Sequence, residues 1–292
     1  MFVEAQTRPV LAKVCRLLDR SVDEALLLRH HTNAVYAVGD VVVKIAPPTI
    51  RLDRLRIVVD VVDWLVAQDF PTVRLIAGLR QPLEIDGHGV TVWERLDAAV
   101  TEPITTGELG GLLRRLHALA VPPIQLPKLD PISGIRRSID ASAILTDDDR
   151  GLLAARLESL ATLWTTMAVP WGSGLIQSDP QIRNALRRAD RTAVLADWDG
   201  ACVGPRAWDV ATVAVHCRRF GTDADFTDFV AEYGGDPRAW DEFEDLCLLR
   251  ELQMIATNAR KSAPGSAAAD EVHHRIAGLR HGQDELTAWN IL

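Results

Sequence analysis

The sequence is poor in cysteine. Its four cysteines are scattered over 292 residues without a C-x-x-C pair, which excludes a zinc knuckle or a disulfide framework and predicts buried thiols. No stretch offers the roughly 18 consecutive apolar residues of a membrane span, and an early acidic residue argues against a secretory signal. We therefore expect a cytoplasmic protein with no membrane partner.

Runs of basic residues are lacking as well. Lysine and arginine number 32 against 40 acidic residues, which gives a net charge of -8. A nucleic-acid binder needs a basic face to neutralise phosphates, so we expect no nucleic-acid partner. The length exceeds the usual size of one hydrophobic core and predicts one large domain or two lobes with a cleft. No pattern in the sequence indicates an oligomeric state.

The period of the apolar residues changes from helical to alternating and back along the first hundred residues. An opening helix is followed by a meander of three strands with polar turns, a second helix, and two further short strands. The predicted helices are 9–22 and 51–70, the meander is 25–45 with turns at 31–33 and 39–40, and the last strands are 73–79 and 89–97.

The remainder of the chain is mostly helical in pattern. A leucine stripe begins after Thr105 or Thr106, either of which suits a helix N-cap, and another helix is predicted from 147 to about 167. Two brief β-like runs interrupt the helices before the helical last third. The order predicts an α+β fold with a small β-rich lobe, 1–97, a connector near its end, and a larger helical lobe, 98–292.

Several oxygen-bearing side chains gather around "LIQSDPQIRNAL" and the "VLADWD" that follows it. Mg²⁺ takes hard oxygen ligands, and Asn184 and Asp197 can supply them from the two sides of a short hairpin. Phosphoryl transfer also needs a residue that orients and deprotonates the attacking hydroxyl, and Asp179 has the loop position for it. Lys44, on a predicted strand, can hold nucleotide phosphates.

These segments, with "VGPRAWDVA" after them, resemble the aminoglycoside phosphotransferase and choline kinase family, small-molecule relatives of protein kinases. The family pattern is H-G-D-x-x-x-x-N, a strand ending in D-W, then G-D-P-x-x-D. Asp179 and Asn184 fall on the first part, Asp197 on the metal-binding aspartate, and Asp209 on the last aspartate, for which we expect a structural role. Lys44 falls on the nucleotide lysine. The resemblance implies a protein-kinase-like, two-lobed fold and covers about 26–215.

The resemblance also implies where a nucleotide binds. ATP or GTP would be the phosphoryl donor and Mg²⁺ the cofactor, with Lys44 on the phosphates. The turn after the first strand would contribute backbone groups and the side chains of Thr32 and Asn33. Backbone groups of the connector would bind the base, and the residues concerned are Trp93, Glu94, Arg95 and Leu96.

Several positions depart from the family pattern. Gln177-Ser178 stands where the family has His-Gly, and because glutamine can both donate and accept hydrogen bonds we expect tuning of the loop more than loss of activity. Pro205 replaces the aspartate of G-D-P. The helix after the lysine strand has no glutamate to pair with Lys44, only aspartates such as Asp53 and Asp60.

The resemblance implies an acceptor that is a small molecule with a hydroxyl group. Acidic residues near the C-terminus are candidates for binding an amine-bearing acceptor such as an aminoglycoside, amino sugar or amino alcohol, although a solvated helix face is the commoner role for such residues. The candidates are Asp241, Glu244, Asp245 and Glu251, with Asn258 behind them. Asp199 fits either a second metal contact or a solvated carboxylate, and His117 is expected to pack. The alternative function is a nucleotide-binding pseudokinase or regulatory scaffold without phosphotransfer.

Overall fold

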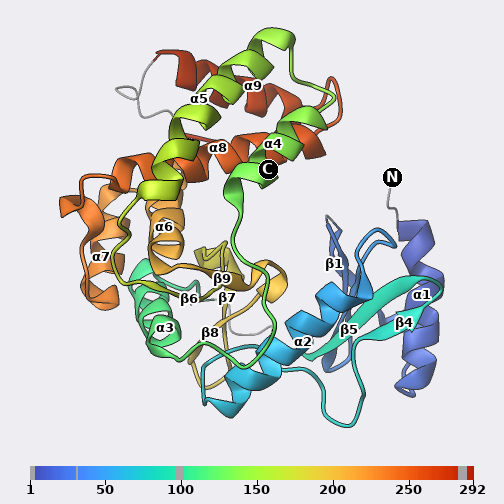
Figure 1. Ribbon diagram of the computed structural model, residues 1–292. Coiled ribbons are helices and arrows are strands. Elements are labelled where there is room, and N and C mark those ends of the chain that lie inside the picture. The colour runs from blue at the N-terminus through green and yellow to red at the C-terminus, as the bar shows by residue number, and fades with distance from the viewer. Residues whose placement is uncertain (1–3, 31, 97–101, 282–287) are drawn as a thin grey trace. The chain divides into compact units, whose positions relative to one another are not determined.

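The computed structural model describes residues 4–30, 32–96, 102–281 and 288–292 (Figure 1). These residues form two compact units. The first unit comprises Met1–Ile104, Val121–Leu126 and Ile182–Ala201, and the second comprises Thr105–Ala120, Pro127–Gln181 and Cys202–Leu292. Each unit is considered by itself below.

An antiparallel sheet of five strands forms the body of the first unit. Its order is β1-β2-β3-β5-β4, and three of its strands are the predicted meander. The strands are β1 (Leu26–His30), β2 (Ala34–Val38), β3 (Val41–Ile45), β4 (Leu83–Ile85) and β5 (His88–Glu94), and the helices are α1 (Glu4–Leu17) and α2 (Leu52–Ala67) with a short 3-10 turn, η1 (Val22–Glu24).

The two faces of the sheet meet different helices. Figure 1 shows α1 on one face and α2 on the other, and α1 packs on β2 and β3 while α2 packs on β5. Successive side chains of a strand alternate between faces. Val41, Val43 and Ile45 are buried in the core that α1 covers, so Lys44 points to the face of α2.

The segment 73–79 is a correction to the predicted strands. It runs beside β5 and makes two backbone bonds, from Ile76 N to Val92 O at 3.1 Å and from Glu94 N to Arg74 O at 2.9 Å. It forms one isolated bridge, Leu75 to Trp93, and no ladder, whereas Leu83–Ile85 pairs regularly with residues 88–90 of β5. The strand beside β5 is therefore β4, which lies within residues 80–89, a segment predicted to be a turn.

A short hairpin also belongs to the first unit, although it lies far along the chain. Strand β7 (Ala185–Arg187) pairs with β8 (Ala193–Leu195), between the short 3-10 turns η2 (Ile182–Asn184) and η3 (Trp198–Gly200). The hairpin is fastened to the segment after α2, because Leu195 N donates to Pro71 O at 2.9 Å. Trp198 is buried and its indole N–H donates to Thr72 Oγ1 at 2.8 Å.

The second unit is mostly helical, with one two-stranded sheet. Its helices are α3 (Thr106–Ala118), α4 (Pro131–Asp140), α5 (Asp147–Thr166), α6 (Arg206–Phe220), α7 (Asp223–Tyr233), α8 (Phe243–Lys261) and α9 (Ala267–His281), with a 3-10 turn η4 (Pro237–Ala239). The strands β6 (Ser173–Ile176) and β9 (Cys202–Pro205) pair antiparallel.

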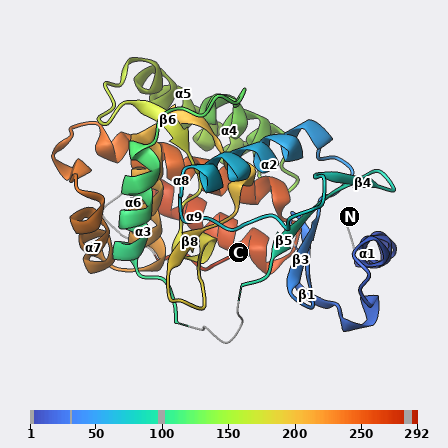
Figure 2. The same ribbon diagram turned by 90° about the horizontal axis from the view of Figure 1, so that it is seen from below.

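Local sequence signals explain the start and the packing of α3. Thr105 is its N-cap and forms a capping box with Glu108, so the predicted cap is confirmed. The helix lies along α7 (Figure 2). Gly110 faces that helix, and a Cβ atom there would come 2.4 Å from the carbonyl oxygen of Phe229. Glycine therefore permits the close approach of the two helices.

The predicted α+β class, with a small antiparallel sheet in one unit and mainly helices in the other, is confirmed. The boundary predicted at residue 97 lies outside the described residues and stays a prediction. The hairpin shows that the first unit also takes in Ile182–Ala201. All four cysteines are buried free thiols, as predicted. Among the described helices, none combines the length and apolar character needed to cross a membrane.

Candidate functional site

A buried aspartate on α6 fixes the loop that carries Asp179. Both oxygens of Asp209 are used: Oδ2 accepts from Gln177 N at 2.9 Å and Oδ1 from Ser178 N at 2.8 Å. His117 Nε2 lies 3.3 Å from Oδ2, and Nδ1 of the same ring lies 2.9 Å from Tyr233 Oη. Asp209 is therefore structural and His117 is packed, as expected.

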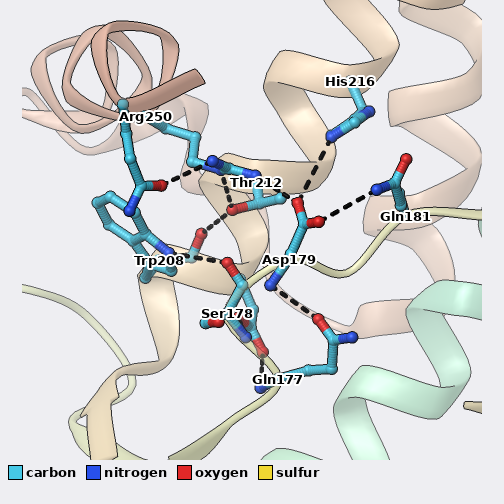
Figure 3. Close-up of polar contacts among 10 residues, drawn as sticks. Gln177, Ser178, Asp179, Gln181, Trp208, Thr212, His216 and Arg250 are labelled. Carbon is cyan, nitrogen blue, oxygen red and sulfur yellow. Dashed lines mark hydrogen bonds and ion pairs between the residues drawn. The ribbon is translucent and has the colours of Figure 1, made fainter. Parts of the chain in front are cut away.

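The unusual pair before Asp179 keeps the loop closed. The side-chain carbonyl of Gln177 accepts from Asp179 N at 2.7 Å, and Trp208 Nε1 donates to Ser178 O at 3.1 Å. Figure 3 shows these bonds around the turn. Ser178 has φ of 74°, a left-handed conformation that favours glycine, and the family pattern has glycine at this position. The side chain of Gln177 and the backbone of Ser178 thus both hold the turn before Asp179.

The Asp179 carboxylate has two hydrogen-bond donors, Arg250 and Gln181, and a nearby histidine, His216, all from its own unit. Arg250 Nη2 on α8 binds Oδ1, His216 Nε2 on α6 lies 3.9 Å from the same oxygen, and Gln181 Nε2 donates to Oδ2 at 3.2 Å (Figure 3). The aspartate side chain is 47% exposed, whereas that of Arg250 is 7% exposed. One carboxylate oxygen is thus held from the protein side while the group keeps access to solvent.

Arg250 is itself held on every side. Its Nε donates to Thr212 Oγ1 at 2.9 Å and its Nη1 to Gln253 Oε1 at 2.7 Å. Burial lowers the pKa of Arg250, and the charges of Asp179 and Asp209 oppose that effect. Its guanidinium keeps the positive charge, because an arginine pKa starts far above neutrality. The catalytic-loop carboxylate therefore has a fixed cationic neighbour.

The first unit holds a second polar cluster, centred on Lys44. Its Nζ lies 2.8 Å from Asp199 Oδ2 and donates to Asp197 Oδ1 at 3.1 Å. Asn33 Nδ2 donates to Asp199 Oδ2 at 2.9 Å, and Arg29 Nη2 lies 3.6 Å from Asp197 Oδ2. The lysine side chain is 13% exposed. Both carboxylates that neutralise it come from the segment after β8.

Charge attraction decides the protonation of this cluster. Burial by itself would lower the pKa of Lys44, but attraction to Asp199 and then Asp197 outweighs burial and raises that pKa above its usual value. Burial would likewise raise the pKa of Asp197, and the charges of Lys44 and then Arg29 hold it below its usual range. The lysine is a cation and the aspartate an anion at neutral pH.

No described contact pairs Lys44 with an aspartate of α2. Asp53 is exposed and pairs with Arg51 in the first turn of the helix, and Asp60 is exposed. The expectation that one of them substitutes for the missing glutamate finds no contact to support it in the described chain. Asp199, 155 residues beyond Lys44, makes the shortest ion pair that the lysine has.

The oxygens predicted to hold a metal lie at one end of the hairpin. Asn184 immediately precedes β7, and one residue, Ala196, separates Asp197 from the end of β8. Ala196 N donates to Asn184 O at 2.7 Å across that end of the hairpin. Asp199 Oδ1 is buried and has no hydrogen-bond partner among the described residues. Carboxylate and amide oxygens, one of them buried and unpartnered, fit the ligand preference of Mg²⁺.

The predicted nucleotide-binding residues are placed as follows. Asn33 is buried and bonded to Asp199, whereas Thr32 is exposed. In the connector, Glu94 N donates to Arg74 O and Arg95 N to Asp40 O, each at 2.9 Å. Those two N–H groups are therefore already used, and contacts to a base stay a prediction for Trp93, Glu94, Arg95 and Leu96 through their other groups.

The acidic candidates for acceptor binding do not share the face of α8 that carries Arg250. At about 100° per residue, the candidates on the helix lie about 80° to 140° around its axis from Arg250. Glu251 is fully buried and bonded through both oxygens to Arg219, at 2.9 Å each. Acceptor binding stays a prediction for the set, which is Asp241, Glu244, Asp245, Glu251 and Asn258.

The residues that sequence reasoning missed are Arg250 and His216. For Arg250, the available signal was a cation within the acidic segment "EDLCLLREL". His216 lies on α6 seven residues after Asp209, and no pattern in the sequence links it to Asp179. Both contacts to Asp179 join segments far apart in the sequence.

The fold is shared with solved kinase structures. One is an amicoumacin kinase in complex with AMP-PNP and Ca²⁺, with a TM-score of 0.79 and 14% identity over 99% of this chain and 98% of that one. A choline/ethanolamine kinase family protein from Mesorhizobium loti has a TM-score of 0.69 and 15% identity over 96% of this chain and 95% of that one. A microcompartment-associated aminopropanol kinase has a TM-score of 0.73 and 19% identity over 92% of this chain and 94% of that one. No curated protein matches the sequence significantly. At these identities the likeness establishes the fold, a two-lobed protein-kinase-like fold.

Such a fold with these side chains defines the class of small-molecule phosphotransferases. The chain belongs to the phosphotransferase enzyme family, whose sequence model matches residues 25–245. The predicted family and enzyme class, a small-molecule kinase, are confirmed. The roles of individual residues, the donor nucleotide and the acceptor are taken up below.

Proposed function

We propose that the protein transfers the γ-phosphoryl group of ATP or GTP to a hydroxyl of a small molecule, with Mg²⁺ as cofactor. The observation that carries this proposal is the state of Asp179. Its loop is anchored by two backbone bonds to Asp209, and its carboxylate is oriented by a buried arginine yet remains 47% exposed. A carboxylate in this state can orient a hydroxyl and accept its proton.

Asp179 has two oxygens with separate duties in this proposal. Arg250 holds Oδ1, so Oδ2, on the side of Gln181, is the oxygen that meets the acceptor hydroxyl. Phosphoryl transfer depends on positioning more than on a strong base. An arginine that fixes the carboxylate rotamer therefore helps the reaction.

Lys44 binds the nucleotide phosphates, and the charges around it decide its position. Lys44 Nζ contacts Asp199 Oδ2, which also accepts from Asn33, and donates to Asp197 Oδ1. The metal would be held by Asn184 and Asp197, with Asp199 Oδ1 as a further oxygen. When bound, Mg²⁺ supplies neutralisation of phosphate charge. Asp199 would thus pair with Lys44 through Oδ2 and bind Mg²⁺ through Oδ1.

The acceptor chemistry follows from the neighbours of Asp179. An amine-bearing acceptor is one proposal, and acidic residues on α8 would attract it. However, the described groups next to Asp179 are Arg250 and His216, and a fixed cation repels an ammonium group close by. We therefore expect any amine to lie at a distance from the reacting hydroxyl, as in an extended amino sugar, and not on the adjacent carbon.

The test is phosphotransfer by the purified chain with Mg·ATP or Mg·GTP and pools of amino sugars, short amino alcohols, sugars and nucleosides. Asp179→Asn is the inactive comparison, and Asp228→Asn, an exposed aspartate on α7, is the matched control. Turnover with one pool that is lost only in Asp179→Asn supports the proposal. Turnover that Asp179→Asn retains would refute the role of this residue.

A nucleotide-binding scaffold without phosphotransfer is the alternative. The residues Gln177 and Ser178 and the missing glutamate after Lys44 favour this alternative. Against it, Asp179 N donates to Gln177 Oε1 and Ser178 N donates to Asp209 Oδ1, so the loop that carries Asp179 is held in place. The scaffold predicts tight nucleotide binding and no turnover with any acceptor pool. The enzyme predicts turnover with at least one of them.

A further inference from the structure

The short segment that carries Asp197 and Asp199 has a strained backbone. Asp197 has φ of 56°, a left-handed conformation that is uncommon outside glycine. Such a conformation costs free energy and persists only where the surrounding structure fixes it. The turn η3 that follows brings the Asp199 carboxylate to 2.8 Å from Lys44. The contacts that fix this segment therefore decide where the partner of the lysine lies.

Two side-chain hydrogen bonds hold the segment from other parts of the first unit. Trp198 Nε1 donates to Thr72 Oγ1 at 2.8 Å, which fixes the residue between the two aspartates. Asn33 Nδ2 donates to Asp199 Oδ2 at 2.9 Å, which orients the carboxylate itself.

A third contact comes from α2. Arg54 Nη2 donates to the backbone oxygen of Asp199 at 3.0 Å, and this bond is partly buried. The helix also packs beside η3. Because the side chain of Asp199 pairs with Lys44, α2 is linked to the lysine through Asp199, although it has no glutamate to offer.

The position of Arg54 is unfavourable for the helix itself. The residue lies in the first turn of α2, where the helix dipole favours acidic side chains and opposes a cation. A residue that breaks a local rule without a local gain indicates a role in tertiary structure or function. The bond to Asp199 O gives a tertiary reason for a cation at this position.

The first turn of α2 is a firm support for this arginine. Asp53 Oδ1 accepts from Arg54 N at 2.9 Å. Leu55 packs on β5 at Gly89, where a Cβ atom would come 2.2 Å from Leu55 Cδ1, so glycine permits the close approach of the helix to the sheet. Strand β5 pairs with β3, which carries Lys44. The arginine and the lysine are thus placed by the same small sheet.

We propose that Arg54 is a positioning residue for Lys44. It holds the backbone of Asp199 so that the carboxylate of that residue meets the lysine, and it thereby takes the place of the glutamate that α2 lacks. The polarity of the link is the reverse of the family pattern, because the helix supplies a cation and the segment after β8 supplies the carboxylate. The inference rests on the proposed role of Lys44 in nucleotide binding.

Nucleotide binding separates positioning from general support of the fold. Arg54→Ala is titrated in EDTA with ADP and with adenosine, beside Arg56→Ala, an exposed arginine of the same helix. We expect ADP to bind about 5-fold more weakly to Arg54→Ala and adenosine to bind unchanged, because only the phosphates meet Lys44. Arg54→Lys should recover part of the loss, since lysine can also donate to a carbonyl. Equal losses for ADP and adenosine would overturn the proposal, as would an equal effect of Arg56→Ala.

A double variant tests whether Arg54 acts through Asp199. Asp199→Asn by itself is expected to weaken ADP binding about 10-fold, and independent effects would multiply to about 50-fold in the double variant. If Arg54 only positions the Asp199 carboxylate, the loss in the double variant stays at about 10-fold. A loss of about 50-fold would refute the link.

Hydrogen exchange tests the anchor without any nucleotide. Within η3, Ala201 N donates to Trp198 O at 3.0 Å. We expect the amides of 198–201 to exchange at least about 3-fold faster in Arg54→Ala than in the native chain or Arg56→Ala, because local opening becomes easier when an anchor is lost. Unchanged exchange would overturn this inference and leave the proposed function standing. A native chain that binds neither ATP nor ADP would overturn the proposed function and this inference with it.

Discussion

Replacing Asp199 by asparagine tests how Lys44 is positioned. The lysine of this chain has no glutamate from α2, and its shortest ion pair, 2.8 Å, is to Asp199 Oδ2. Asparagine keeps the shape of the side chain and removes the charge. The lysine then keeps Asp197 as its only carboxylate partner among the contacts described.

The magnitude follows from the contact that is lost. A hydrogen bond to a charged group contributes about 1.5–3 kcal/mol. Asp197 remains at 3.1 Å, so the lower end of that range applies, and about 1.4 kcal/mol corresponds to a tenfold change in affinity. We expect Asp199→Asn to weaken nucleotide binding about 10-fold. Asp60→Asn, an exposed aspartate on α2, should leave it unchanged.

The assay is nucleotide affinity measured with Mg²⁺ and again in EDTA. If Asp199 acts by positioning Lys44, the loss persists without metal. If it acts only as a metal ligand, the loss vanishes in EDTA, and removal of a negative charge near the phosphates makes the variant bind as well as or better than the native chain. That second outcome would falsify the positioning role. Thermal unfolding of both variants checks that the fold is retained.

Three further predictions concern stability. Ser178→Gly should raise the free energy of unfolding by about 0.5–1 kcal/mol, since serine is strained at φ of 74°; no change in thermal unfolding would mean that the turn is not strained. Asp209→Ala should cost about 3 kcal/mol or more in urea unfolding, because two backbone N–H groups and His117 lose their acceptor; a cost below 1 kcal/mol would contradict the anchoring role. Burial raises the pKa of the Cys217 thiol to about 12, above the unfolded value of about 8.5. Its stabilising contribution is therefore complete below about pH 8.5 and is lost as the pH rises through about 12. The stability difference between the native chain and Cys217→Ala should shrink from pH 8 to pH 10.5, and a difference that stays constant would contradict burial.

Local patterns were enough to predict most elements of the fold. Short valine-rich runs mark β2 and β3, and the Gly39-Asp40 turn separates them, so these strands are visible within five consecutive residues each. The capping box at Thr105 likewise lies within four residues. The segment 73–79 was predicted wrongly because its pattern suits a strand, whereas it makes one isolated bridge, Leu75 to Trp93, and Leu83–Ile85 forms the ladder with β5.

Spacing also predicted a catalytic loop, since Asp179 and Asn184 lie five residues apart and Asp197 follows a short strand. These positions are chain-local, and the family pattern conserves their order. Their contacts are not local. Arg250 binds Asp179 from 71 residues away, and Lys44 pairs with Asp199, which is 155 residues away.

The sequence alone therefore determined the class of fold, the family and the residues expected to carry phosphoryl transfer. Each of these follows from the spacing of apolar residues or from a short sequence motif. Only the tertiary structure decided which charge stands beside Asp179 and which carboxylate holds Lys44. Ion pairs depend on which helix faces meet, and the facing of helices is settled by packing between residues that no short pattern connects.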